Sequence, residues 1–187
     1  MRRLFIGVGL SGDAETAAVA LLSRLQREVQ HQALRWVKPE KLHVTLAFLG
    51  PVEEERVPEV VAAIADGSVG TPPFALSLGS IGGFPDLGRP KVVWLGVSES
   101  EALAHLQRNV SEQVGRLVRL EDRVYHPHVT LGRVSPGSPA VGHMVRTIGE
   151  ELGDIGAEWT VNEVRLYEST SDGRYEVVET VRLPGVP

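Results

Sequence analysis

The tetrapeptide His-Val-Thr-Leu occurs twice in this chain of 187 residues, at 43–46 and again at 128–131. Each copy lies inside a short apolar stretch, HVTLAFLG from His43 and HVTLGRV from His128. A single His-x-Thr is weak evidence, because many strands contain one by chance. Two copies in matching surroundings, one in each half of the chain, indicate that the chain repeats one architecture.

The apolar periodicity supports this interpretation, because it predicts the same order in both halves: strand, helix, short strand, motif strand, helix, strand. The expected strands lie at 2–10, 34–37, 41–50, 74–84, 91–97, 116–120 and 128–134, with a closing hairpin of 159–169 and 174–183. The expected helices begin at a cap on Asp13, near Glu53, at a capping box of Ser98 and Glu101, and at Ser138-Pro139.

These elements predict an α+β protein with a single domain over residues 1–187. Two pseudo-symmetric lobes are expected, approximately 1–85 and 90–187, with the Gly/Pro-rich loop at 82–90 as the crossing between them. A pseudo-two-fold axis would bring the two motif strands to equivalent places facing one cleft. The second strand of the final hairpin has no counterpart in the first half.

The composition narrows the classes of function. The chain has no cysteine, which excludes disulfides, a thiol nucleophile and thiolate-bound metal clusters. No apolar stretch approaches the length of a membrane span, and the N-terminal apolar run is too short and glycine-rich for a signal peptide. The formal net charge is −5, whereas a protein that coats long duplexes is expected to be basic. A nucleic-acid partner would therefore be a short piece or an end.

The two motifs can supply paired acid–base chemistry. Residues i and i+2 of a strand share one face, so His43 projects with Thr45, and His128 with Thr130. One histidine can be neutral while the other is protonated near neutral pH, which general base and general acid catalysis requires. The threonine hydroxyls can donate to non-bridging phosphate oxygens during an in-line displacement, and such a mechanism needs no metal.

Two further side chains are candidates for the same site but have the wrong strand parity. Phe48 and Arg133 each lie three residues beyond a motif threonine, on the opposite face of a regular strand. A β-bulge or a strand end is needed to turn either of them toward the substrate.

Other interpretations of the histidines remain open. Taken alone, each motif histidine can be an ordinary hydrogen-bonded strand residue. His126 and His128 have the spacing of a metal-binding pair, but no third ligand of suitable type stands nearby. His31, His105 and His143 fall on or beside predicted helices, and we expect them at the surface.

The stretches KLHVTLAFLG and YHPHVTLGRV resemble the two-histidine (2H) phosphoesterases. Within that superfamily they resemble the RNA 2′,3′-cyclic phosphodiesterase branch, also described as 2′–5′ RNA ligase-like or LigT-like. The resemblance covers nearly the whole chain. It implies a bilobal α+β fold, in which antiparallel sheets line a central cleft and helices lie outside.

The resemblance also implies a reaction and roles for the residues. A 2′,3′-cyclic phosphate at an RNA end would be hydrolysed to a 2′-phosphate without a metal or other cofactor. His128 would be the general base and His43 the general acid. Thr45 and Thr130 would hold the phosphate, while Phe48 and Arg133 would flank the terminal base. Pseudo-symmetry permits the reverse assignment of base and acid.

Rival functions use the same four motif residues. One is the cleavage or joining of 2′–5′ linkages, and another is hydrolysis of ADP-ribose cyclic phosphate. Outside the enzyme class, a module could bind nucleotides or RNA ends without turnover, although it would have no need for two proton-transfer groups. The expected partners are RNA 3′ ends, short oligonucleotides and cyclic mononucleotides. We expect a cytoplasmic monomer with no membrane association and no obligate protein partner.

Overall fold

The computed structural model describes residues 1–121 and 124–185 of the chain. Its strands are β1 (Arg2–Gly9), β2 (Leu34–Trp36), β3 (His43–Val52), β4 (Phe74–Phe84), β5 (Val92–Val97), β6 (His128–Val134), β7 (Glu158–Val161), β8 (Glu163–Ser169) and β9 (Tyr175–Arg182). Its helices are α1 (Gly12–Glu28), α2 (Val57–Ser68), α3 (Glu101–Gly115) and α4 (Pro139–Leu152).

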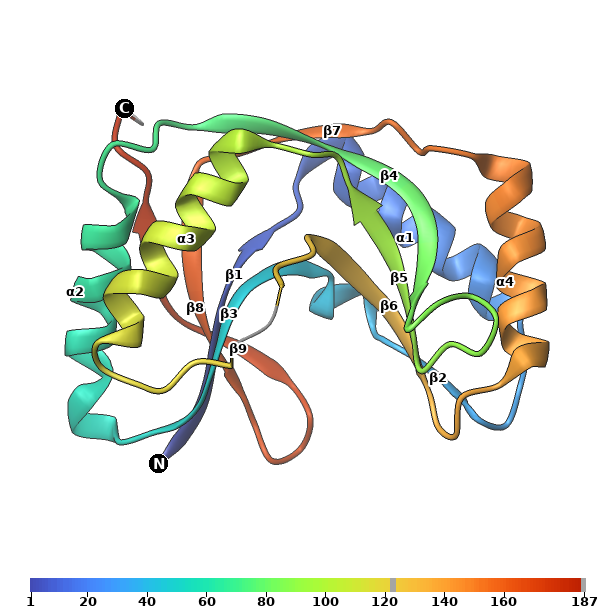
Figure 1. The fold of residues 1–187 in the computed structure, drawn as a ribbon, viewed down its shortest axis with the longest axis horizontal. Helices are drawn as coiled ribbons and strands as arrows, with labels where there is room; N and C mark the ends of the chain where they lie inside the picture. Colours follow the sequence, from blue (N-terminus) through green and yellow to red (C-terminus); the bar gives the residue numbers. More distant parts are fainter. Residues whose placement is uncertain (122–123, 186–187) are drawn as a thin grey trace.

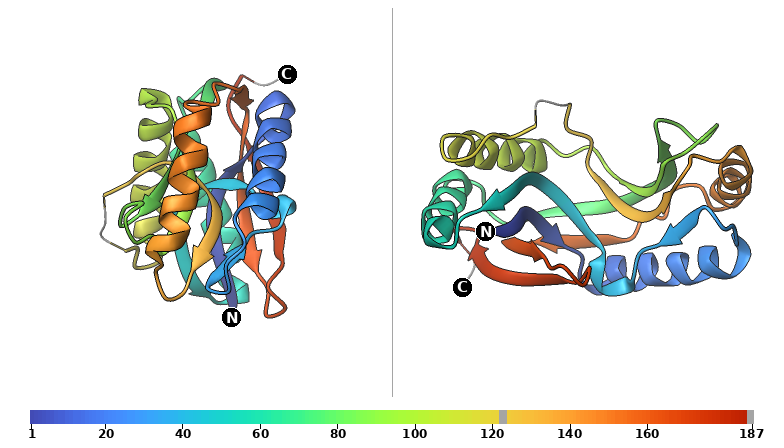
Figure 2. Two further views of the ribbon diagram at one scale, coloured as in Figure 1. Left: turned by 90° about the vertical axis from the view of Figure 1, so that its right-hand side faces the viewer. Right: turned by 90° about the horizontal axis from the view of Figure 1, so that it is seen from below.

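The strands form one strongly curved sheet (Figure 1 and Figure 2). Their order is β7-β4-β5-β6-β3-β1-β8-β9, with β2 paired to β6, and every described pair is antiparallel. Helices α2 and α3 stand together at one end of the molecule, and α1 and α4 at the other. The predicted α+β class is confirmed. In the described part of the chain, no helix is long and apolar enough to cross a membrane.

The strand pairing interleaves the two halves of the sequence. Strand β2 from the first half pairs with β6 from the second, and β8 from the second half pairs with β1 from the first. The loop at 82–90 closes a hairpin, because Phe84 pairs with Val92. It therefore joins neighbouring strands of the sheet, and the crossing between lobes expected at this loop stays a prediction. The single domain with lobes at 1–85 and 90–187 stays a prediction.

Alternation along the motif strands separates the core from the candidate site. In β3, Val44 and Leu46 are almost fully buried, while His43 and Thr45 are only partly buried. In β6, Val129 and Leu131 have no exposed surface. Each helix also turns apolar residues to the core, and the buried ones include Leu22 of α1, Leu106 of α3 and Val145 of α4.

Two predicted helix starts need correction. Asp13 lies inside the first turn of α1, after the N-cap residue Ser11, and does not cap it. Helix α3 is capped by Ser100, whose Oγ accepts from the Leu103 backbone N–H at 3.2 Å. The predicted cap Ser98 instead accepts from the backbone N–H of Ser77, at 3.2 Å, so it joins the end of β5 to β4. The cap at Ser138 is confirmed.

Two predicted strands also differ from the structure. Residues 116–120 form a turn and loop after α3, not a strand. The stretch at 159–169 forms two strands, because the chain leaves the ladder at Asn162. The first piece, β7, pairs with β4, and the second, β8, pairs with β1 and β9. Local periodicity does not reveal this division, because it depends on pairing with β4 and β1, which are distant in sequence from this stretch.

A close backbone contact holds α2 against α3. A Cβ added at Gly67 of α2 would lie 2.6 Å from the Val110 Cα of α3, closer than real Cβ contacts allow. We expect Gly67→Ala to lower the free energy of unfolding by about 1–3 kcal/mol, because it overpacks this interface. The matched control is Gly149→Ala in α4, where the nearest atom is the Ile81 Cβ at 3.5 Å. That variant should be neutral or up to about 1 kcal/mol more stable.

Denaturant unfolding of the three proteins checks this expectation. Equal stabilities for the two alanine variants would contradict the tight α2–α3 contact.

Candidate active site

The two motif strands are neighbours in the sheet. Strands β3 and β6 run antiparallel, and Val44 pairs with Val129. This register sets each motif histidine beside the threonine of the other motif. The valines point into the core, so the four polar side chains project from the other face. The structure therefore brings together the residues that the sequence predicted to converge.

His43 is held by hydrogen bonds at both ring nitrogens. Its Nδ1 lies 2.6 Å from the Lys41 backbone carbonyl, which can only accept, so Nδ1 carries the proton. Its Nε2 lies 2.9 Å from the Thr45 Oγ, which donates to the neutral ring. The local fold thus fixes the tautomer and directs Nε2 toward the motif threonine.

An aromatic wall surrounds the His43 ring. Phe5 lies at 5.0 Å between ring centroids, and Tyr167 and Tyr175 at 5.6 Å each. Desolvation by this burial lowers the pKa of His43 from 6.5 to about 4, and the electrostatic interaction with His128 lowers it further. The carbonyl that accepts from Nδ1 opposes the shift only in part. In the unliganded protein His43 is therefore neutral at pH 7.

His128 repeats the arrangement of His43 with different neighbours. Its Nδ1 lies 2.7 Å from the His126 backbone carbonyl, again two residues earlier in the chain. The ring of Phe84 meets it edge-on, at 5.0 Å and 85°. Both motif histidines thus use Nδ1 for a backbone carbonyl, which assigns any proton transfer by each ring to Nε2.

Two equivalent β-bulges explain how Phe48 and Arg133 reach the site face. Between Thr45 and Ala47, β3 advances two residues while β1 advances one, so Leu46 is the extra residue. Strand β6 does the same at Leu131, opposite β5. Each bulge resets the alternation three residues beyond the start of its motif. Phe48 and Arg133 therefore lie on the same face as the motif histidines, although regular alternation would place them on the opposite face.

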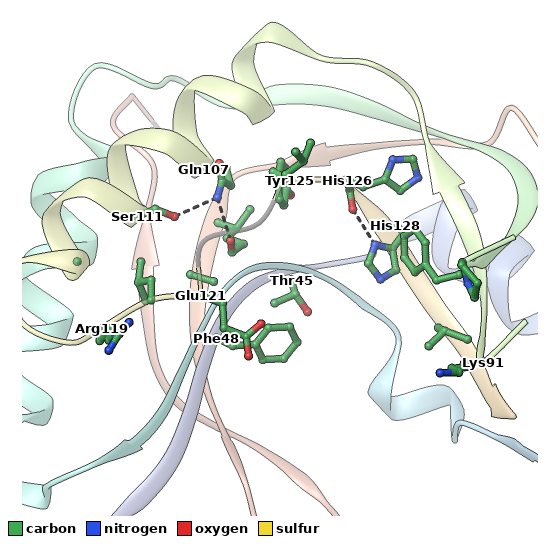
Figure 3. A pocket seen from close by; sticks show the side chains of 18 residues that line it. Thr45, Phe48, Lys91, Gln107, Ser111, Arg119, Glu121, Tyr125, His126 and His128 are labelled. Carbon is green, nitrogen blue, oxygen red and sulfur yellow. Dashed lines mark hydrogen bonds between the residues drawn. The ribbon is translucent and has the colours of Figure 1, made fainter. Parts of the chain in front are cut away.

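A cavity of about 980 Å³ opens beside Thr45 and His128, and we call it the reaction pocket (Figure 3); His43 and Thr130 lie next to these two residues but are not part of its lining. Thr45, Phe48 and His128 line it from the sheet. Phe84 adds apolar surface to the lining, and Lys91 lies below His128 in the view of Figure 3. A second cavity of about 1110 Å³ shares Phe48 with the first, and Arg133 lines this second cavity.

Helix α3 and the loop after it supply residues that the sequence did not reveal. Gln107 donates to the Leu46 carbonyl at 3.3 Å and to Ser111 Oγ at 3.0 Å, and both α3 side chains line the reaction pocket. Tyr125 lines it as well, and its buried hydroxyl has no hydrogen-bond partner within the described residues. Burial raises the pKa of Tyr125 far above its usual range, so the phenol stays protonated. In the sequence, Gln107 and Ser111 were indistinguishable from the polar face of an amphipathic helix.

The remaining histidines lie away from these cavities, apart from His126. His105 and His143 are exposed on α3 and α4, as predicted, and His31 lies partly buried beyond the end of α1. His126 stacks beside His128 with ring centroids 6.2 Å apart, and it lines the reaction pocket. Across residues 1–121 and 124–185, no three His, Cys, Asp or Glu side chains gather closely enough to hold a metal ion.

Residues 14–173 match the family model described as the 2′-5′ RNA ligase superfamily. The chain belongs to this superfamily. It is 32% identical to the RNA 2′,3′-cyclic phosphodiesterase of Archaeoglobus fulgidus, over 97% of this chain and 98% of that one. It is also 32% identical to the enzyme of the same name from Aquifex aeolicus, over 98% of each chain.

Solved structures of this superfamily share the fold. The protein TT0787 of Thermus thermophilus matches with a TM-score of 0.77 and 27% identity, over 98% of both chains. Escherichia coli LigT in complex with 3′-AMP matches with a TM-score of 0.75 and 26% identity, also over 98% of both chains. The predicted family, fold class and enzyme class are confirmed.

The lowered pKa of His43 predicts a dependence of stability on pH. An unfolded chain binds a proton at this histidine below about pH 6.5, whereas the folded protein does so only near pH 4. Stability from this group is therefore complete above pH 6.5 and is lost as the pH falls toward 4. Between pH 7.5 and pH 5.0 the wild type should lose about 2 kcal/mol more than His43→Gln. Denaturant titrations at the two pH values measure this difference, and equal losses would contradict a buried neutral His43.

Proposed function

We propose that this protein hydrolyses the 2′,3′-cyclic phosphate at an RNA end to a 2′-phosphate, by acid–base catalysis without a metal. The observation that carries the proposal is the pair of histidines with fixed tautomers on adjacent strands. In each, Nδ1 is held by a backbone carbonyl, so Nε2 is the nitrogen proposed to transfer the proton, and a threonine of the other motif lies beside each ring. The names of the full-length relatives give the substrate class.

The proposed reaction is a single in-line displacement. The His128 Nε2 removes a proton from water as the water oxygen attacks phosphorus. The bond from phosphorus to the 3′ oxygen breaks, and the His43 Nε2 donates its proton to that oxygen. Thr45 and Thr130 donate to the non-bridging oxygens, where negative charge sits.

The substrate itself supplies the condition that His43 needs to act as an acid. Before a substrate binds, His43 is neutral, because burial lowers its pKa to about 4. An anionic phosphate at about 4 Å would favour the protonated ring by about 4 kcal/mol at an effective dielectric constant of 20. That equals about three pKa units, enough to return the pKa of His43 to the neutral range. On protonation, Nε2 becomes a donor, and the Thr45 hydroxyl is released to donate to phosphate.

Phe48 and Arg133 are proposed to hold the terminal base. Both are turned onto the site face by their bulges, and the Phe48 side chain is 43% exposed in the wall between the two cavities. An aromatic face stacks on any base, so this contact positions the terminal nucleotide without selecting the identity of its base.

Ligation or cleavage of 2′–5′ linkages would use the same four residues. The superfamily description keeps this alternative open at the level of substrate. No feature of the described residues favours ADP-ribose cyclic phosphate over an RNA end. A non-catalytic binding module does not fit the confirmed enzyme class.

The first functional prediction concerns the two histidines. His43→Ala and His128→Ala should each lower kcat by about 10²–10⁴-fold, because each removes one proton-transfer group. Thr45→Ala and Thr130→Ala should cost less, because the proton relay survives. His105→Ala, on the exposed face of α3, is the matched control and should keep wild-type kcat. Melting curves establish that each variant folds, and a folded histidine variant with near wild-type kcat would contradict the mechanism.

The second functional prediction concerns the product. Seating of the ribose leaves only one oxygen opposite the attacking water, so one regioisomer should form. We expect the 2′-phosphate from all four cyclic nucleotides at comparable rates, with the same activity in excess EDTA as in magnesium or zinc. Phosphorus NMR against 2′- and 3′-monophosphate standards identifies the product. Pure 3′-phosphate would reverse the roles of His43 and His128, and loss of activity in EDTA would contradict the metal-free mechanism.

A further inference from the structure

The second cavity, which we call the arginine pocket, lies beyond Phe48 from the reaction pocket. Phe48, Arg119 and Glu121 line both cavities, so the two adjoin. None of the four motif side chains lines the arginine pocket. Figure 3 shows Phe48 between Arg119 and His128, so the aromatic ring separates the cationic side of the groove from the reacting side.

Three guanidinium groups line the arginine pocket, from Arg3, Arg119 and Arg133. All three residues are exposed, and none makes an ion pair or a side-chain hydrogen bond within residues 1–121 and 124–185. Two carboxylates share the wall. Glu168 is already bound by Arg2, with 2.7 Å between N and O, and Glu121 is the other. Positive charge therefore gathers here on a chain whose formal net charge is −5.

The path from the reaction pocket to these arginines is aromatic. Phe48 stands at the ridge, Phe5 lies 6.1 Å from it between ring centroids, and Tyr175 lies 4.9 Å from Phe5. All three rings line the arginine pocket. Aromatic faces beside a cationic groove are the combination by which proteins bind single-stranded nucleic acid. Guanidinium groups suit phosphate, because their paired N–H groups match its oxygens and they stay charged.

We propose that the arginine pocket binds the nucleotide that precedes the RNA terminus, with Arg3 and Arg119 contacting its backbone phosphate. The inference rests on the proposed function, because the terminal phosphate must lie among the motif residues for the preceding nucleotide to reach this pocket. The preferred substrate is then an RNA chain end of at least two nucleotides, not a cyclic mononucleotide.

Steady-state kinetics with two substrates test the proposal. Adenosine 2′,3′-cyclic phosphate serves as the mononucleotide, and ApA ending in a 2′,3′-cyclic phosphate as the dinucleotide. The quantity measured is the ratio of kcat/KM for the dinucleotide to that for the mononucleotide. In the wild type this ratio should exceed one and fall as salt rises, because a phosphate contact is screened.

The variants Arg3→Gln and Arg119→Gln should each lower the ratio about two- to fivefold, the range for one exposed charge pair. The double variant should lower it by roughly the product of the two effects and weaken its salt dependence. Arg27→Gln removes another exposed arginine, on α1 away from both cavities, and should leave the ratio at its wild-type value. Lys91→Gln tests the alternative that the RNA strand leaves the reaction pocket past Lys91, on the side opposite Arg119.

The outcomes separate this inference from the function on which it rests. Failure to hydrolyse either substrate would overturn the proposed function. Hydrolysis of both with a ratio near one, or a ratio unchanged in the Arg3 and Arg119 variants, would overturn the arginine pocket alone. A fall in the ratio for Lys91→Gln but not for the arginine variants would place the preceding nucleotide on the side of Lys91 and also overturn the proposal.

Discussion

The backbone pairing of Val44 with Val129 is the constraint on which the site depends. It joins two strands that lie 85 residues apart in the sequence and belong to different halves of the duplicated pattern. Because the strands are antiparallel, one register brings both histidines and both threonines to one face. The buried valines fix that register, since a slip by one residue would expose them and turn the polar groups into the core. The same apolar packing that stabilises the sheet therefore assembles the candidate active site.

The two motif strands are built alike but placed in different surroundings. In each, the histidine Nδ1 donates to the carbonyl two residues earlier, and a bulge at the motif leucine brings another side chain onto the site face. The surroundings then break the symmetry. His43 is enclosed by Phe5 and two tyrosines, which hold it neutral, whereas His128 faces the open reaction pocket. Different surroundings of two equivalent groups are a physical route to one acid and one base in the same site.

Features set by local pattern could be predicted from the sequence, whereas features set by distant partners could not. Alternation placed His43 with Thr45, and periodicity located all four helices. Phe48 and Arg133 needed a bulge or a strand end to reach the site. The sequence around Leu46 and Leu131 carries no local signal for a bulge, because the two bulges arise from pairing with β1 and β5. The break at Asn162 was missed for the same reason. Arg3, Arg119 and Arg133 are scattered along the chain and come together only in the folded protein, from β1, the loop after α3 and β6.

The central claim is that a phosphate bound in the site raises the pKa of His43, so that this neutral, desolvated histidine takes up a proton. The most direct measurement is an NMR titration of the histidine ring nitrogens, with and without uridine 2′-monophosphate. The proposed mechanism predicts that the free His43 is neutral at pH 7, protonated at Nδ1, and titrates near pH 4. With the nucleotide bound, its midpoint should rise by at least one pH unit. A free His43 that titrates near 6.5, or one whose midpoint does not move when the nucleotide binds, would contradict the mechanism.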